Sequence, residues 1–215
     1  MHPLRFDPRN HLSMLCLGAH ADDIEIGCGG TVLRLLDEYP CMSVNWVVFS
    51  ADGPREEEAK ASATEFLCKA CGAKIAIHKF RDGGFPSQTP EIKETFEQLK
   101  GDIEPDLILT HTHNDAHQDH RVIAELTAQT FRMQMILGYE IPKYDCDLGN
   151  PNFYVPLAQG FCERKIEMLI KHFITQRSRH WFDAELFQSL LRLRGMNAVA
   201  SSGRAEAFYC GKVIV

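Results

Sequence analysis

The stretch Met14-Leu15-Cys16-Leu17-Gly18-Ala19-His20-Ala21-Asp22-Asp23 decides how this chain folds. Its first four residues have the length and apolarity of a buried strand, and a polar loop with one imidazole and two carboxylates follows at once. Residues 31–36 then carry apolar side chains at helical spacing. This order of strand, polar loop and helix predicts a parallel α/β sheet, in which ligands bind at the carboxyl ends of the strands.

The cluster from His20 to Asp23 has three interpretations. His20 and Asp23, three residues apart in a tight loop, can face one metal ion while Asp22 points elsewhere. Alternatively, one of the two aspartates accepts backbone N–H bonds as a helix cap or an Asx turn. A dinucleotide-binding phosphate loop is disfavoured, because the G-x-G-x-x-G spacing fails at Val32 and two carboxylates would repel a pyrophosphate.

Length and composition predict a single domain over residues 1–215. The chain is 45% hydrophobic, enough for one sizeable core. A net charge of −6 and a pI near 5.9 argue against nucleic acid as a partner. No stretch approaches the roughly 20 apolar residues of a membrane span, and the first residues lack the apolar region of a signal peptide. We therefore expect a cytoplasmic protein.

The eight cysteines are expected to be reduced thiols, because the cytoplasm keeps thiols reduced. Cys68 and Cys71 form a C-x-x-C pair, but no second pair completes a zinc site. The pair lies in an Ala-rich helical pattern that Gly72 closes, which predicts a packing role.

The first half of the chain repeats the strand and helix unit, which predicts a doubly wound parallel sheet with helices on both faces. In the usual strand order 3-2-1-4-5 of such sheets, the first and fourth strands are neighbours. The second half predicts a long loop, two helices and a last strand. The expected strands are 43–49, 73–79, 107–110, 134–139 and 208–215, the helices are 56–71, 89–101, 121–131, 163–174 and 184–193, and the loop is 142–156.

A second polar cluster follows the expected fourth strand: His111-Thr112-His113-Asn114-Asp115-Ala116-His117-Gln118-Asp119-His120. It holds four of the ten histidines of the chain. If the first and fourth strands are neighbours, both clusters meet at the carboxyl edge of the sheet. His20, Asp23 and one histidine of the second cluster then supply three ligands, the number typical of a catalytic zinc with an open fourth position.

Both clusters contain motifs of a known family. Ala19-His20-Ala21-Asp22-Asp23 is similar to the signature A-H-P-D-D, and His117-Gln118-Asp119-His120 is similar to H-x-D-H. Weaker similarities lie at residues 81–83 and 205–208. The chain thus resembles the PIG-L/LmbE family of metal-dependent N-deacetylases. The resemblance implies a Rossmann-like doubly wound domain.

The resemblance also implies the metal ligands, which are His20, Asp23 and His120. Zinc is the expected ion, and another divalent metal such as Fe²⁺ is the alternative. Ala21 departs from the signature, because the family has proline there and proline fixes φ near −65°. We expect a looser loop and a weaker metal affinity, with the same ligands.

The remaining motif residues acquire catalytic roles from the same resemblance. Asp22 would be the general base that takes a proton from a metal-activated water, and His117 would be the acid or oxyanion stabiliser. Asp119 would orient His117, although a helix N-cap is the simpler alternative. Arg55 and Asp82 are candidate substrate-binding residues, beside the simpler interpretations of a solvated first-turn residue and an Asp-Gly turn.

Three classes of function remain. The first is a hydrolase that removes an N-acetyl or other N-acyl group from an amino sugar or its conjugate, with this small molecule as its partner. The second is a Rossmann-like nucleotide- or sugar-binding module with a structural metal or none, against which Asp22 and His117 argue. The third is a redox enzyme, because ferrous oxygenases use two histidines and one carboxylate. The sequence leaves a homo-oligomer open.

Overall fold

The computed structural model describes residue 7 and residues 11–212, which fold around one seven-stranded sheet. The strand order is β3-β2-β1-β4-β5-β7-β6. Strands β1 to β5 pair in parallel, and β7 runs antiparallel to β5 and β6. The predicted doubly wound, mostly parallel α/β fold is confirmed. The strands are β1 (Leu12–His20), β2 (Met42–Ser50), β3 (Gly72–Ile77), β4 (Leu107–His111), β5 (Met135–Tyr139), β6 (Phe153–Pro156) and β7 (Ala205–Cys210).

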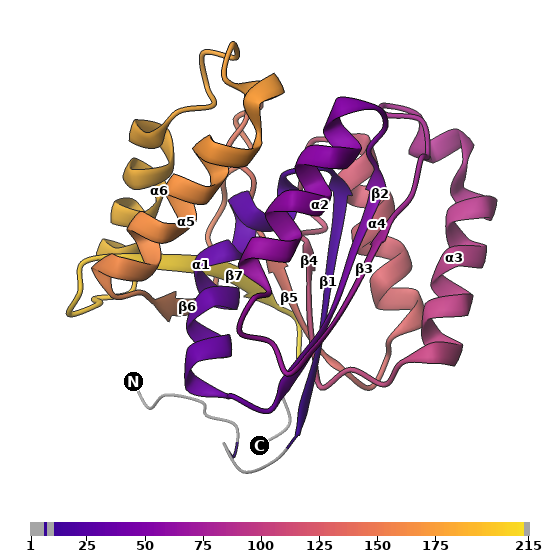
Figure 1. Cartoon of the computed structure of the whole chain (residues 1–215), viewed down its shortest axis with the longest axis horizontal. Helices are drawn as coiled ribbons and strands as arrows, with labels where there is room; N and C mark the ends of the chain where they lie inside the picture. Colours follow the sequence, from indigo (N-terminus) through magenta and orange to yellow (C-terminus); the bar gives the residue numbers. More distant parts are fainter. Residues whose placement is uncertain (1–6, 8–10, 213–215) are drawn as a thin grey trace.

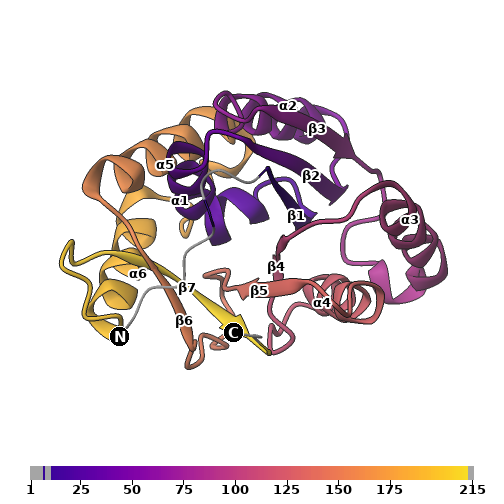
Figure 2. The same ribbon diagram turned by 90° about the horizontal axis from the view of Figure 1, so that it is seen from below.

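Helices cover both faces of the sheet (Figures 1 and 2). One layer contains α1, α2, α5 and α6, and the other contains α3 and α4. None of the helices in the described part of the chain is both long and apolar enough to cross a bilayer. The helices are α1 (Asp23–Glu38), α2 (Pro54–Phe66), α3 (Thr89–Asp102), α4 (Gln118–Thr130), α5 (Gln159–His172) and α6 (Ala184–Asn197), with short 3₁₀ helices at Phe85–Ser87 and Ile174–Gln176.

Strand β1 is buried on both faces and divides its side chains between two apolar clusters. Met14 and Cys16 pack into the cluster under α1, α2, α5 and α6. Leu15 and Leu17 pack into the cluster under α3 and α4. Successive side chains of a strand point to opposite faces, so one continuous apolar run fills both layers. This burial fixes the end of β1, and hence His20, at the centre of the sheet.

Helix α1 begins at Asp23, eight residues before the helical pattern at residue 31 that the sequence indicates. Gly27, Gly29 and Gly30 lie inside the helix. A Cβ atom on Gly27 would stand 2.1 Å from the ring of Tyr139 on β5, so glycine permits this close approach. Packing against the sheet therefore overrides the weak helix propensity of glycine.

Glu206 on β7 reaches into the middle of α1. Its carboxylate accepts the backbone N–H groups of Gly30, at 2.9 Å, and Thr31, at 2.6 Å. Lys165 on α5 donates to the same carboxylate at 2.6 Å and to the carbonyl of Ile26 at 2.7 Å. All four polar contacts are buried, so the pairing of these groups joins the last strand to the first helix.

The C-terminal part of the sheet differs from the prediction. The predicted loop 142–156 contains β6, which pairs with β7 through Phe153 opposite Phe208. The last strand starts at Ala205 and ends at Cys210, so it begins and ends earlier than the predicted range 208–215. Residues 213–215 of that range lie outside the described residues. Antiparallel pairing over about fifty residues leaves no local signal in the sequence.

The packing role predicted for the C-x-x-C pair is wrong. Helix α2 ends at Phe66, and both Cys68 and Cys71 are exposed in the turn before β3. Cys71 donates its backbone N–H to the carbonyl of Met42, which starts the pairing of β2 with β3. All eight cysteines are free thiols.

Candidate active site

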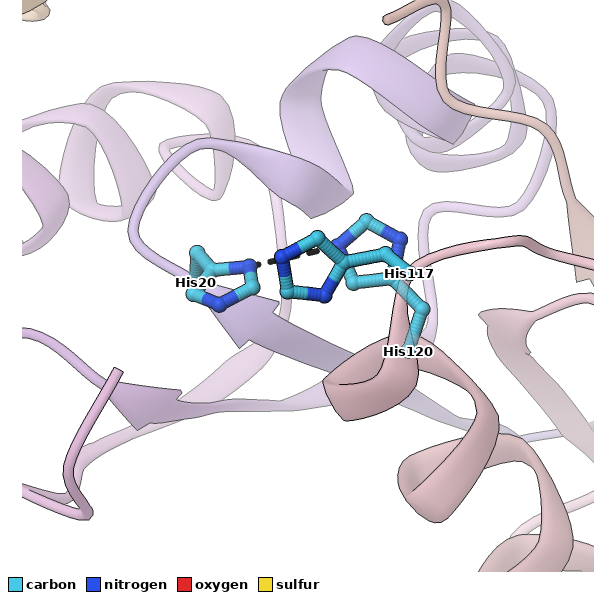
Figure 3. A group of neighbouring side chains, drawn as sticks. All are labelled: His20, His117 and His120. Carbon is cyan, nitrogen blue, oxygen red and sulfur yellow. Dashed lines mark hydrogen bonds between the residues drawn. The ribbon is translucent and has the colours of Figure 1, made fainter. Parts of the chain in front are cut away.

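The two polar clusters meet at the carboxyl ends of β1 and β4, as predicted. These strands pair in parallel with Met14 opposite Leu107, so both end at the same edge of the sheet. His20 ends β1, and His120 lies in the first turn of α4 after the N-cap residue His117. Figure 3 shows the three imidazole rings gathered between the end of β1 and the start of α4.

Three atoms of the types that bind metals lie close together at this point. His20 Nδ1 is 3.2 Å from His120 Nε2, and Asp23 Oδ2 is 3.2 Å from His20 Nδ1 and 3.5 Å from His120 Nε2. Ligand atoms bound at 2.0–2.1 Å by a tetrahedral ion lie about 3.3 Å apart. The spacing and the two imidazoles with one carboxylate therefore fit a divalent metal such as zinc.

The charge around these atoms also favours a cation. The carboxylates of Asp23, Asp119 and Asp82 hold the pKa of His20 well above its usual value, although burial acts in the opposite direction. Burial, with the nearby His111, lowers the pKa of His120 to about 4. His120 is therefore a neutral imidazole at pH 7, which is the form that binds a metal.

The other two nearby histidines are placed differently. His111 is buried, and its Nε2 accepts the backbone N–H of Ala19 at 3.0 Å, so its lone pair is engaged. His117 Nδ1 accepts the backbone N–H of Asp119 at 3.2 Å, which leaves the proton of the neutral ring on Nε2. Burial lowers the pKa of His117, and the nearby His20 acts in the same direction. His117 therefore presents an N–H donor beside the three ligand atoms.

Asp115 is a site residue that sequence reasoning missed. This buried carboxylate contacts His120 Nδ1 through Oδ2 at 2.9 Å, and its Oδ1 accepts the backbone N–H of His117 at 2.8 Å. A carboxylate on the far nitrogen of a histidine ligand fixes the ring orientation and makes the ligand more basic. The only sequence signal is an aspartate five residues before His120, which no motif identified.

Asp119 occupies a different position from the one expected. Its carboxylate lies 3.3 Å from His20 Nε2 and accepts the backbone N–H groups of Gly83, at 2.7 Å, and Phe85, at 3.1 Å. The contact with His117 comes from the backbone N–H of Asp119. Asp119 thus holds His20 and the 83–85 loop, while the N-cap of α4 is His117.

Asp22 lies beside the ligand set with a basic partner. It is the buried N-cap residue of α1, and the Nη2 atom of Arg55 donates to its Oδ1 at 2.7 Å. Burial raises the pKa of Asp22, and the charge of Arg55 opposes that effect. Arg55 was expected to bind substrate, and the structure places its guanidinium on Asp22.

Asp82 is the most accessible of the predicted site residues. Its side chain is 71% exposed, and its Oδ1 lies 3.1 Å from His20 Nε2. The hydrogen bond to His20 lowers the pKa of Asp82, so the group is an acceptor at pH 7. The next residue, Gly83, has a φ of 70°, which favours glycine and turns the loop sharply at the mouth of the site.

The sequence that forms this site matches a known protein family. The model described as PIG-L, GlcNAc-PI de-N-acetylase, matches residues 15–131. The chain belongs to the PIG-L family. The matched range contains all of the site residues described above. Among curated proteins, the uncharacterized deacetylase YaiS of Escherichia coli K12 is 27% identical over 171 residues, which cover 74% of this chain and 89% of YaiS.

Solved structures share the fold of this PIG-L protein at low identity. N,N′-diacetylchitobiose deacetylase from Pyrococcus horikoshii superposes with a TM-score of 0.69 at 19% identity, covering 95% of this chain and 87% of that one. The 4-carboxy-2-hydroxymuconate hydratase GalB from Pseudomonas putida KT2440 gives 0.72 at 15% identity, covering 95% and 98%. The fold therefore serves more than one reaction, and the reaction must be argued from the site.

Proposed function

We propose that this PIG-L protein is a zinc-dependent hydrolase that removes an N-acetyl group from an amino sugar or an amino-sugar conjugate. One observation carries the proposal: His20, Asp23 and His120 surround one point, with Asp22 and His117 beside them. A structural metal site needs neither a spare base nor a spare proton donor. Membership of a deacetylase family supports the same reaction.

The three ligand residues define what a metal contributes. Held there, a divalent ion would polarise the amide carbonyl and lower the pKa of water to about 7. Two imidazoles and one carboxylate also suit ferrous iron, which is the alternative metal. Ala21 is fully buried, so tight packing restrains this loop although the signature proline is missing.

Asp22 is proposed as the general base. As water attacks the amide carbonyl carbon, a carboxylate oxygen of Asp22 takes one proton of that water. Arg55 keeps the carboxylate oriented through its contact with Oδ1. Asp22 then gives the proton to the departing nitrogen as the C–N bond breaks, so the products are acetate and a free amine.

His117 is proposed to stabilise the oxyanion of the tetrahedral intermediate. Because Nδ1 is occupied by the N–H of Asp119, Nε2 carries the hydrogen that the oxyanion can accept. The lowered pKa of His117 favours this neutral donor over an imidazolium that acts as a strong acid at pH 7. Of the two roles that the family resemblance implies for His117, we therefore propose oxyanion stabilisation rather than that of the acid.

The substrate and the setting complete the proposal. A small N-acetylated sugar or sugar conjugate is the proposed partner, and the cytoplasm is the proposed location. Asp82, exposed at the mouth of the site, would accept hydrogen bonds from sugar hydroxyls. A nucleotide- or sugar-binding module without catalysis is less well supported, because it gives Asp22 and His117 no role.

A substrate panel tests the proposed reaction. The purified chain loaded with Zn²⁺ should release acetate and a free amine from at least one member of a panel of N-acetyl sugars, nucleotide sugars and thiol conjugates. The metal-free chain is the control and should be inactive. A metal-loaded chain that binds these sugars and releases no acetate would support the binding module instead. Metal analysis after aerobic and anaerobic purification separates zinc from iron.

Substitution of Asp82 tests the sugar itself. Asp82→Ala should lower kcat/KM for a sugar amide by about 1–3 kcal/mol, roughly 5- to 150-fold, because a charged hydrogen-bond acceptor is lost. A small hydroxyl-free N-acetyl amide should be affected little. Metal content should stay unchanged, because Asp119 still contacts His20 Nε2. Asp52→Ala is the matched control, since Asp52 is another exposed aspartate at the end of a strand. An equal loss on both substrates would place Asp82 in the scaffold.

A further inference from the structure

Lys143, just after β5, is a nearly buried cation that the proposed reaction does not use. Its side chain is 12% exposed, and its Nζ lies 3.0 Å from Asp115 Oδ1 and 2.5 Å from Asp147 Oδ2. It also donates to the carbonyl of Ile141 at 3.3 Å. Asp115 also contacts His120. Lys143 is therefore connected to a proposed metal ligand through one intervening carboxylate.

Asp147 fastens the same loop to the second polar cluster. Its Oδ2 accepts the backbone N–H of Ala116 at 2.7 Å and also forms the ion pair with Lys143. Its Oδ1 is buried with no hydrogen-bond partner among the described residues, so Lys143 is the one cation that offsets this carboxylate there. Residues 143–147 are therefore attached to residues 115–116 through two carboxylates and one ammonium group.

The loop also reaches the surface around the site. Tyr144, between Lys143 and Asp147, is 65% exposed, and its hydroxyl lies 3.0 Å from His180 Nδ1 in the connection between α5 and α6. In Figure 1 that connection lies at the end of the molecule where β1 and β2 finish. A change in the position of Lys143 would therefore change the positions of both the exposed Tyr144 and the buried Asp115.

Charge explains why the ammonium group matters to His120. Four groups contact one another in sequence: the imidazole of His120, the carboxylate of Asp115, the ammonium of Lys143 and the carboxylate of Asp147. Without Lys143, the buried carboxylate of Asp115 and the mostly buried carboxylate of Asp147 would have no cation between them, which is costly away from water. Either the loop or Asp115 must then move, and the ring of His120 loses its fixed orientation.

We propose that Lys143 is a positioning residue for the metal site, acting on His120 through Asp115 and tying the 143–147 loop to that ligand. The inference rests on the proposed function, in which His120 binds the metal. It adds that metal affinity depends on a loop outside both sequence motifs. By linkage, a bound metal in turn stabilises the attached conformation of the loop.

Metal binding tests this role without an activity assay. The affinity of the full chain for Co²⁺ is measured by competition with a chelator, and the visible spectrum of the bound Co²⁺ reports the ligand geometry. Lys143→Met should displace Asp115 from His120, and losing such a partner of a ligand weakens metal binding by about 10- to 100-fold. We therefore expect Co²⁺ binding to weaken by up to that amount, with a changed spectrum. Lys143→Arg keeps the charge and should recover most of the affinity.

Two further variants separate this role from a general loss of stability. Lys93→Met removes a lysine whose contacts, with Glu97 and Thr130, lie in the α3 and α4 layer, and it should leave the affinity and spectrum unchanged. Asp147→Asn keeps an oxygen that accepts the N–H of Ala116 but removes the negative charge beside Lys143. It should weaken Co²⁺ binding, though less than Lys143→Met does. Asp147→Asn therefore tests the inference if Lys143→Met does not fold.

The outcomes distinguish the inference from the proposed function. Wild-type affinity and spectrum in Lys143→Met, or in Asp147→Asn if Lys143→Met does not fold, would overturn the positioning role and leave the deacetylase proposal intact. An equal loss in Lys143→Met and Lys93→Met would also overturn it. Failure of the wild-type chain to bind Co²⁺ would instead remove the metal site, and the proposed function with it.

Discussion

Replacing Asp22 with Asn is expected to lower kcat by about two to four orders of magnitude, the range typical of a general acid-base group. Asn has the same shape and keeps an oxygen that can accept the hydrogen bond of Arg55, so the fold and the α1 N-cap position should survive. The amide cannot take a proton from water. Steady-state rates on the best substrate of the panel and metal content per chain are the measurements.

The pH profile adds a second readout for Asp22→Asn. Activity that depends on an ionised carboxylate falls as the pH drops through its pKa, and burial raises that of Asp22. The residual activity of the variant should lack this acid limb. Asp52→Asn, at an exposed aspartate, is the control and should retain the wild-type rate and profile. Full activity of Asp22→Asn would exclude Asp22 as the base.

Replacing His120 with Ala is expected to remove most of the bound metal. In the proposed site His120 supplies one of three ligand atoms, so the variant would keep His20 and Asp23 of that set. Emission spectrometry after gel filtration should find close to one zinc per wild-type chain and a small fraction of that in the variant. Activity should fall at least as far as metal content.

His113→Ala is the matched control for that experiment. His113 belongs to the same histidine-rich stretch but is exposed, so its loss should change neither metal content nor activity. His120→Ala also leaves a buried oxygen of Asp115 without its partner, so thermal unfolding must confirm that the variant is folded. Equal metal content in the wild type and in folded His120→Ala would contradict the ligand assignment.

The sequence predicts the sheet and the meeting of the two clusters because both depend on local patterns. Apolar runs such as Met14 to Leu17 and the regular alternation with helices are enough to predict a parallel sheet in the order 3-2-1-4-5. Once that order is assumed, His20 and His120 must approach each other although they are 100 residues apart.

Contacts between distant side chains could not be predicted in the same way. The position of Asp115 behind His120 depends on how the loop before α4 turns, and no residue pattern encodes that turn. The glycines of α1 contact Tyr139 and Glu206, which lie on strands much later in the chain, so local sequence gives no sign of these contacts. The β6 and β7 pair likewise forms only when two distant segments meet.

The contact of Glu206 with α1 has a consequence for synthesis on the ribosome. The backbone N–H groups of Gly30 and Thr31 donate to the carboxylate of Glu206, which lies 176 and 175 residues later in the chain. Helix α1, which carries Asp23 at its start, therefore lacks part of its final hydrogen bonding until residue 206 has emerged. A nascent chain would complete these contacts in the middle of α1 only after β7 has emerged, so we expect a product truncated before β7 to hold α1 less firmly.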